Sequence, residues 1–74
     1  MNNTYFVVQF DTGSYWAGNN SVTDQIRNAR FYSRLKDVRY WADSALKRLS
    51  KLSNIKSYKI ISVNINILGE VKDD

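Results

Sequence analysis

The segment 33–52 constrains the fold most, because it is the longest stretch with a clear helical period. Apolar residues recur there at alternating steps of three and four, which places one apolar face on an α-helix. The members of this stripe are Leu35, Val38, Ala42, Ala45, Leu49 and Leu52, with Trp41 and Leu46 at its edges. We expect Ser33 to cap the start of the helix, Asn54 to provide a left-handed cap after its end near Leu52, and Trp41 to lie in the core.

The segments on either side of this helix read as strands. Residues 5–10 are rich in β-branched and aromatic residues, and a short polar start precedes them. Asp11 and Gly13 supply turn chemistry, and residues 15–17 return as a second short strand, so we predict a β-hairpin. Residues 58–68 form the clearest strand, because isoleucine and valine alternate there with serine and asparagine. We expect one face of this strand to lie under the helix and the other to face solvent.

The region between the hairpin and the helix is less clear. Residues 18–21 (GNNS) read as a loop, and residues 22–29 fit more than one structure. We favour one helical turn, capped by Ser21 or Thr23 and running through Ile26. Residues 30–32 then form either a short strand or the lead-in to the main helix.

The expected fold class is α+β, with a small antiparallel sheet (N-terminal hairpin plus long C-terminal strand) packed against one amphipathic helix in a single domain, 1–74. Residues 70–74 are expected to be a frayed acidic tail.

Composition argues against enzyme and metal chemistry. The chain has no cysteine and no histidine, which removes thiolate catalysis, the commonest general base and the commonest zinc ligands. The seven acidic residues fit turns, helix positions and the tail, and none of the recognised ligand spacings occurs. We therefore expect a non-enzymatic protein without cofactor or metal. We find no export signal and no apolar run long enough to span a bilayer, so we expect a cytoplasmic protein without a membrane partner.

Charge is distributed unevenly along the chain. Residues 27–59 contain ten basic and two acidic residues, whereas the segments on either side each carry a net charge of −2. Such a basic band attracts phosphates or an acidic protein surface. On the polar side of the predicted helix we expect five residues to form a binding surface: Lys36, Arg39, Tyr40, Lys47 and Lys51. The alternative is a solvated helix face that keeps a small domain soluble.

The hairpin offers a second candidate patch. Tyr15 and Trp16 could present aromatic rings on an open sheet face, as in several RNA-binding sheets. The hairpin carries no basic residue to hold a nucleic-acid backbone, however, and no RNP-type consensus is present. The favoured alternative is that Trp16 and its neighbours close one end of the core.

The layout also resembles that of a group of known proteins. An N-terminal hairpin is followed by DQIRNARFYSRLKDVRYWADSALKRL and a terminal strand, with Ala29-Arg30-Phe31-Tyr32 leading into a helix that contains Trp41-Ala42. This arrangement is similar to small accessory proteins of phages and mobile elements of Gram-positive bacteria. The resemblance implies a non-enzymatic protein made early in infection that binds and blocks a host factor, including CRISPR or other defence machinery. No residue-level role comes with it.

Three functional hypotheses follow. The leading one is a small inhibitor that occupies a surface of a host or defence protein. The second is a nucleic-acid-binding accessory protein that uses the same basic face. The third is a homodimer that pairs through the exposed edge of the terminal strand.

Overall fold

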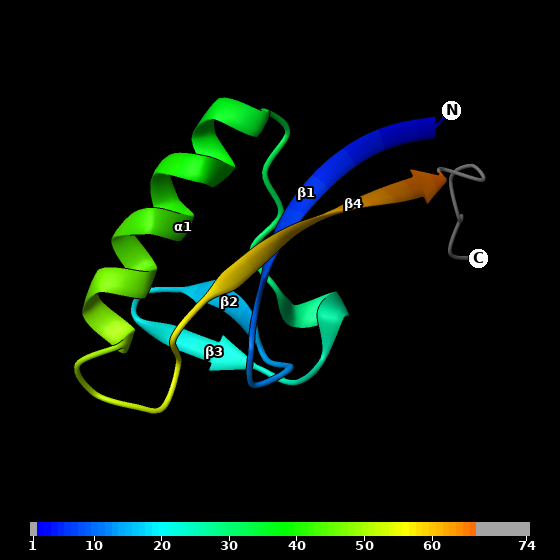
Figure 1. The fold of residues 1–74 in the computed structure, drawn as a ribbon. Helices are drawn as coiled ribbons and strands as arrows, with labels where there is room; N and C mark the ends of the chain where they lie inside the picture. Colours follow the sequence, from blue (N-terminus) through cyan, green and yellow to red (C-terminus); the bar gives the residue numbers. More distant parts are fainter. Residues whose placement is uncertain (1, 67–74) are drawn as a thin grey trace.

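The structure is a computed structural model, and it describes residues 2–66 of the 74-residue chain. The described elements are β1 (Asn2–Phe10), β2 (Tyr15–Gly18), β3 (Ser21–Thr23), the 3-10 turn η1 (Ile26–Asn28), α1 (Leu35–Leu49) and β4 (Tyr58–Asn66). The strands form one antiparallel sheet in the order β3-β2-β1-β4, and α1 packs against β1 and β4 on one face of it (Figure 1). The predicted α+β fold, with its hairpin and C-terminal strand packed against one helix, is confirmed.

The predicted hairpin is formed by β1 and β2. Gly13 takes a positive φ of 89°, and its amide donates to the carbonyl of Phe10 at 2.9 Å, which closes the turn. Gln9 then lies opposite Tyr15. The polar start expected for residues 1–4 is wrong, because β1 already begins at Asn2. That end of β1 is held by pairing with β4 rather than by its own composition.

The GNNS loop is a tight turn, and β3, a strand that the sequence did not predict, begins at its last residue. Asn19 and Asn20 have φ values of 52° and 59°, so they form a tight two-residue turn that joins β2 to β3. The Ser21 hydroxyl donates to the Gly18 carbonyl at 2.6 Å and braces this turn. Asparagine tolerates the left-handed region better than most residues, which is why the chain can reverse here.

The segment from β3 to α1 follows the favoured interpretation in part. A helical turn is present as η1, but it begins at Ile26, where the expected turn was to end. Its N-cap is Gln25, so neither Ser21 nor Thr23 caps it, although the Thr23 hydroxyl accepts the amide of Gln25 at 3.1 Å. The following short strand is reduced to one bridge, in which Tyr32 pairs with Phe6 of β1. Tyr32 therefore lies on the edge of β1 that faces away from β4.

The helix is shorter than its apolar stripe predicts. It begins after Arg34, which takes the N-cap position without a side-chain hydrogen bond, so Ser33 is not the cap. It ends at Leu49, followed by Ser50 in right-handed helical geometry, and Asn54 has no positive φ. Leu52 is 80% exposed, because the chain has left the helical path before its side chain can turn inward.

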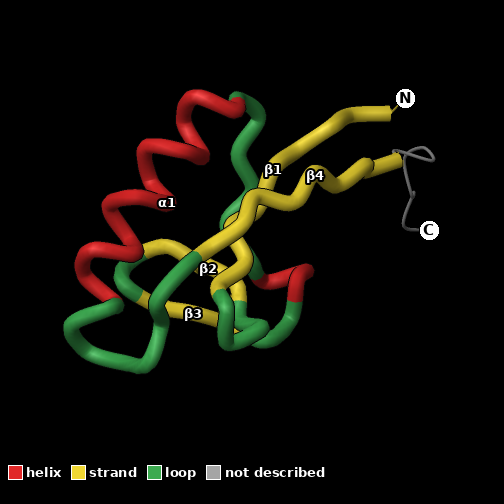
Figure 2. The backbone as a smooth tube through the Cα atoms, in the orientation of Figure 1, coloured by secondary structure: helices red, strands yellow, loops and turns green. Residues whose placement is uncertain are grey.

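The core lies between α1 and the sheet. Its buried residues are Val8, Phe10, Trp16, Val38, Ala42, Ala45, Leu49 and Ile55. On β4 the residues packed against this core are Tyr58 and Ile60, whereas Ile61, Val63 and Ile65 lie on the opposite sheet face and are half-buried. One face of β4 thus lies toward the helix, as expected, but the other face is half-buried rather than open to solvent. Beyond α1, the ends of β1 and β4 continue side by side as a two-stranded arm (Figures 1 and 2).

Candidate functional site: the basic face of α1

The outward side of α1 carries four of the predicted contact residues. Lys36, Tyr40 and Lys47 lie above one another because they are spaced by four and seven residues, and Arg39 lies beside them. All four are exposed, and Tyr40 is 68% exposed. Lys51 is also exposed but lies in the turn just beyond the helix. We call these five residues, Lys36, Arg39, Tyr40, Lys47 and Lys51, the basic face.

An aromatic pair lies at the centre of α1. The rings of Tyr40 and Trp41 meet edge to face, with centroids 5.3 Å apart and planes at 89°. Trp41 is 41% exposed, so the expectation that it is a core residue is wrong. It borders a small pocket of about 160 Å³ whose other lining residues include Arg30 and Tyr32. The basic face is thus continuous with exposed aromatic surface.

The C-terminal end of α1 forms a second hollow of about 420 Å³. Its lining combines cations with leucines: Asn20, Lys47, Arg48, Leu49, Lys51 and Leu52. Arg48 donates to Asn20 and to Ser44, both at 3.0 Å, so the β2–β3 turn is held against the helix. Leu52 is 80% exposed and lies beside Lys47 and Lys51, an exposed position that its place in the helical stripe concealed.

A tyrosine on β4 binds an acidic residue of α1 next to the basic face. The Tyr58 hydroxyl donates to the Asp43 carboxylate at 2.6 Å and so ties β4 to α1. This hydrogen bond raises the pKa of Tyr58, with burial and the Asp43 charge acting in the same direction and Arg39 opposing them. This bond fixes Asp43 against β4, and the four cations of the basic face outnumber the two acidic residues of α1, Asp37 and Asp43.

The second predicted patch is not assembled. Trp16 is only 3% exposed and packs in the core, and its indole N–H donates to the Tyr32 hydroxyl at 3.0 Å. Tyr15 is half-buried on the other face of the sheet, because adjacent strand residues point in opposite directions. Trp16 therefore belongs to the core, as the favoured alternative predicted, and the two rings do not share a surface.

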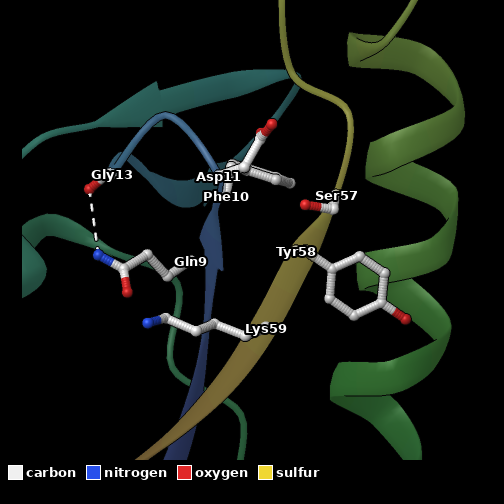
Figure 3. Close-up of a pocket in the computed structure, with 7 residues that line it drawn as sticks. All are labelled: Gln9, Phe10, Asp11, Gly13, Ser57, Tyr58 and Lys59. Carbon is white, nitrogen blue, oxygen red and sulfur yellow. Dashed lines mark hydrogen bonds between the residues drawn. The ribbon is translucent and has the colours of Figure 1, made fainter.

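A third hollow, of about 270 Å³, lies where the hairpin meets the start of β4 (Figure 3). Asp11 is the only acidic residue among those lining it, and its carboxylate accepts the amide of Lys56 at 3.1 Å. The Gln9 side chain donates to the Gly13 carbonyl at 3.3 Å, as the dashed line shows. The Tyr58 ring points toward α1, and Lys59 lies on the other side of β4. The Asp11–Lys56 bond joins the hairpin turn to the segment before β4, whereas the Gln9–Gly13 bond lies within the hairpin.

Within residues 2–66 no cluster of three acidic, cysteine or histidine residues could hold a metal ion, and no helix is long and apolar enough to cross a membrane. No protein-family model, curated protein or solved structure matches the sequence or the fold.

Proposed function

We propose that this protein binds an acidic surface of a larger protein through the basic face of α1 and inhibits that protein by occupying the surface. The observation that carries the proposal is Tyr40, which is 68% exposed, packs against Trp41 and lies between Lys36 and Lys47 along the same helix. Tyrosine, tryptophan and arginine are the residues on which interface energy most often concentrates.

Charge supports an acidic target. The band 27–59 carries a net charge of +8, of which α1 contributes +2. Its cations Lys36, Arg39 and Lys47 lie on the side of α1 away from the sheet. Such a surface accelerates encounters with an oppositely charged partner and disfavours like-charged ones. Arg39 and Lys47 fit the rim of such an interface, because rim charges act mainly on association rate and on salt dependence.

Exposed apolar side chains favour a protein partner over a nucleic acid. Leu52 is 80% exposed beside Lys47 and Lys51, and Trp41 is 41% exposed beside Tyr40. A phosphate backbone offers no apolar contact for a leucine side chain. An acidic protein surface with small apolar pockets accommodates both the leucine and the lysines. Because of the layout resemblance to phage and mobile-element accessory proteins, we propose a host or defence-system protein, such as a CRISPR nuclease, as the target.

The proposal is tested by affinity capture from a Gram-positive bacterial lysate, with and without nuclease. We expect the wild-type chain to retain one protein in both arms. Tyr40→Ala should weaken that complex by about 10- to 100-fold, because truncating a central aromatic anchor typically costs about 1.4–2.7 kcal/mol. The separate charge reversal Lys47→Glu should also weaken the complex, and its effect should be larger at low salt than at high salt.

A matched control distinguishes binding through the basic face from a general effect of the protein's positive charge. Arg27→Glu makes the same charge change on η1, an exposed position away from α1, and should leave capture intact (Figure 1). Capture that Tyr40→Ala and Arg27→Glu affect equally would contradict the assignment of the face. Complete loss of captured protein after nuclease treatment, together with a steep log-linear salt dependence on duplex DNA or RNA, would favour nucleic-acid binding instead.

A further inference from the structure

The outer edge of β4 is open along the described strand. β4 lies at the end of the sheet order β3-β2-β1-β4, and no other described strand pairs with its far side. It is nine residues long and pairs with β1 from Asn2↔Asn66 to Phe10↔Tyr58 without interruption. An edge of this length presents a row of backbone donors and acceptors that another strand could pair with.

The pairing of Phe6 shows which groups point outward. The Phe6 amide donates to the Tyr32 carbonyl at 2.7 Å, and the Tyr32 amide donates to the Phe6 carbonyl at 2.9 Å. Both groups of Phe6 therefore point away from β4, so Phe6 and Ser62 are a non-hydrogen-bonded pair. By alternation, the amides and carbonyls of Ile60, Ser62 and Asn64 point to the free edge.

This edge lacks the usual protection against pairing. Natural edge strands are commonly interrupted by proline, bulges or charged side chains. The chain has no proline, the β1–β4 register is continuous, and residues 60–66 carry no charge. Ser62 and Asn64 are exposed small polar residues that a neighbouring strand can approach.

The strand is complementary to itself. In an antiparallel pair centred on Ser62, all nine residues of β4 find a counterpart, and every outward backbone group meets another outward group. Ile61 then lies opposite Val63 of the second copy in a non-hydrogen-bonded position, where side chains approach most closely. Lys59 lies opposite Ile65, so the two copies of Lys59 are about 20 Å apart along the strands and do not repel strongly.

The second sheet face adds an apolar contribution. On the side of β4 away from α1, three residues are half-buried: Ile61, Val63 and Ile65. They lie next to Tyr5 of β1, and the ring centroids of Tyr5 and Phe31 are 6.2 Å apart. Pairing through β4 would continue this apolar row from one copy into the next and bury more of each isoleucine and valine. A foreign strand would need the same alternation, whereas a second copy supplies it.

We propose that two copies of this chain pair edge to edge through β4 about a twofold axis at Ser62, forming one eight-stranded sheet with both helices on the same face. The pairing does not depend on the binding role of the basic face.

Sedimentation equilibrium tests this pairing. The 8.6-kDa chain should shift reversibly to twice that mass as its concentration rises. Ser62→Lys places two like charges directly opposite each other at the axis and should weaken dimerisation at least about tenfold. Ser33→Lys is the matched control, because Ser33 is exposed and follows Tyr32 on the other side of β1. A wild-type chain that stays monomeric into the millimolar range, or a Ser62→Lys variant that dimerises as the wild type does, would overturn the proposal.

Amide hydrogen exchange gives a second readout that needs no variant. The outward amides of Ile60, Ser62 and Asn64 should exchange quickly at low concentration and slowly at high concentration. The amides of Ile61 and Val63, which pair with β1, should be protected at both. Protection of the outward amides that does not change with concentration would show that the edge is already covered within one chain, and the proposal would fail.

Discussion

The indole N–H of Trp16 donates a 3.0 Å hydrogen bond to the phenolic oxygen of Tyr32, joining β2 to the residue that bridges β1. Trp16 is 3% exposed, so its polar group has been taken out of water and needs this partner. The same contact explains why Trp16 belongs to the core rather than to a binding surface.

We expect Tyr32→Phe to lower the free energy of unfolding by about 1–3 kcal/mol, because the buried indole N–H would lose its acceptor while the ring stays in place. Chemical denaturation followed by tryptophan fluorescence measures the change. Tyr40→Phe is the matched control and should stay within about 0.5 kcal/mol of the wild type, because Tyr40 is exposed. Equal stabilities of the two variants would show that the Trp16–Tyr32 bond is energetically unimportant.

Stability should fall as the pH rises above about 10. The Asp43 hydrogen bond raises the pKa of Tyr58, and burial raises the pKa of Tyr32, both from an ordinary value of 10.0. The unfolded chain then loses these protons before the folded chain does, so their stabilising effect is complete below pH 10 and is lost as pH rises through the folded-state pKa values. Tyr58→Phe should flatten this decline, as measured by denaturation midpoints across alkaline pH. A decline as steep as that of the wild type would contradict the role of the Tyr58–Asp43 bond.

The two leucines at the end of α1 should respond differently to truncation. Leu49 is 7% exposed in the core, so Leu49→Ala should cost about 2–5 kcal/mol. Leu52 is 80% exposed, so Leu52→Ala should change the free energy of unfolding by less than about 0.5 kcal/mol. Thermal unfolding followed by circular dichroism measures both. Similar losses for the two variants would mean that the apolar stripe of the helix continues past Leu49.

The β2–β3 turn should depend on left-handed backbone geometry at Asn20. Asn20→Ala and Asn20→Gly both remove the side chain that accepts from Arg48, but only glycine adopts a φ of 59° without strain. We therefore expect the alanine variant to be less stable than the glycine variant by about 1 kcal/mol. Denaturant titration of the pair measures this difference, and the opposite order would indicate a different turn conformation.

Several elements could be read from local patterns because their causes are local. Spacings of three and four determined a helix through Val38, Ala42 and Ala45, and the Asp-Thr-Gly turn determined the hairpin. The outward position of Lys36, Tyr40 and Lys47 follows from the same period. These properties depend on neighbours only a few residues away, so the amino-acid order alone was sufficient.

Other properties were decided by partners distant in the chain. The first residues of β1 are a strand because β4 pairs with them, and a polar composition does not reveal such a partner. Alternation in β4 defines two faces without saying which of them the helix covers, and the packing places Tyr58 and Ile60 on the covered face. In each case long-range contacts, not local preference, chose between arrangements that the sequence allowed equally.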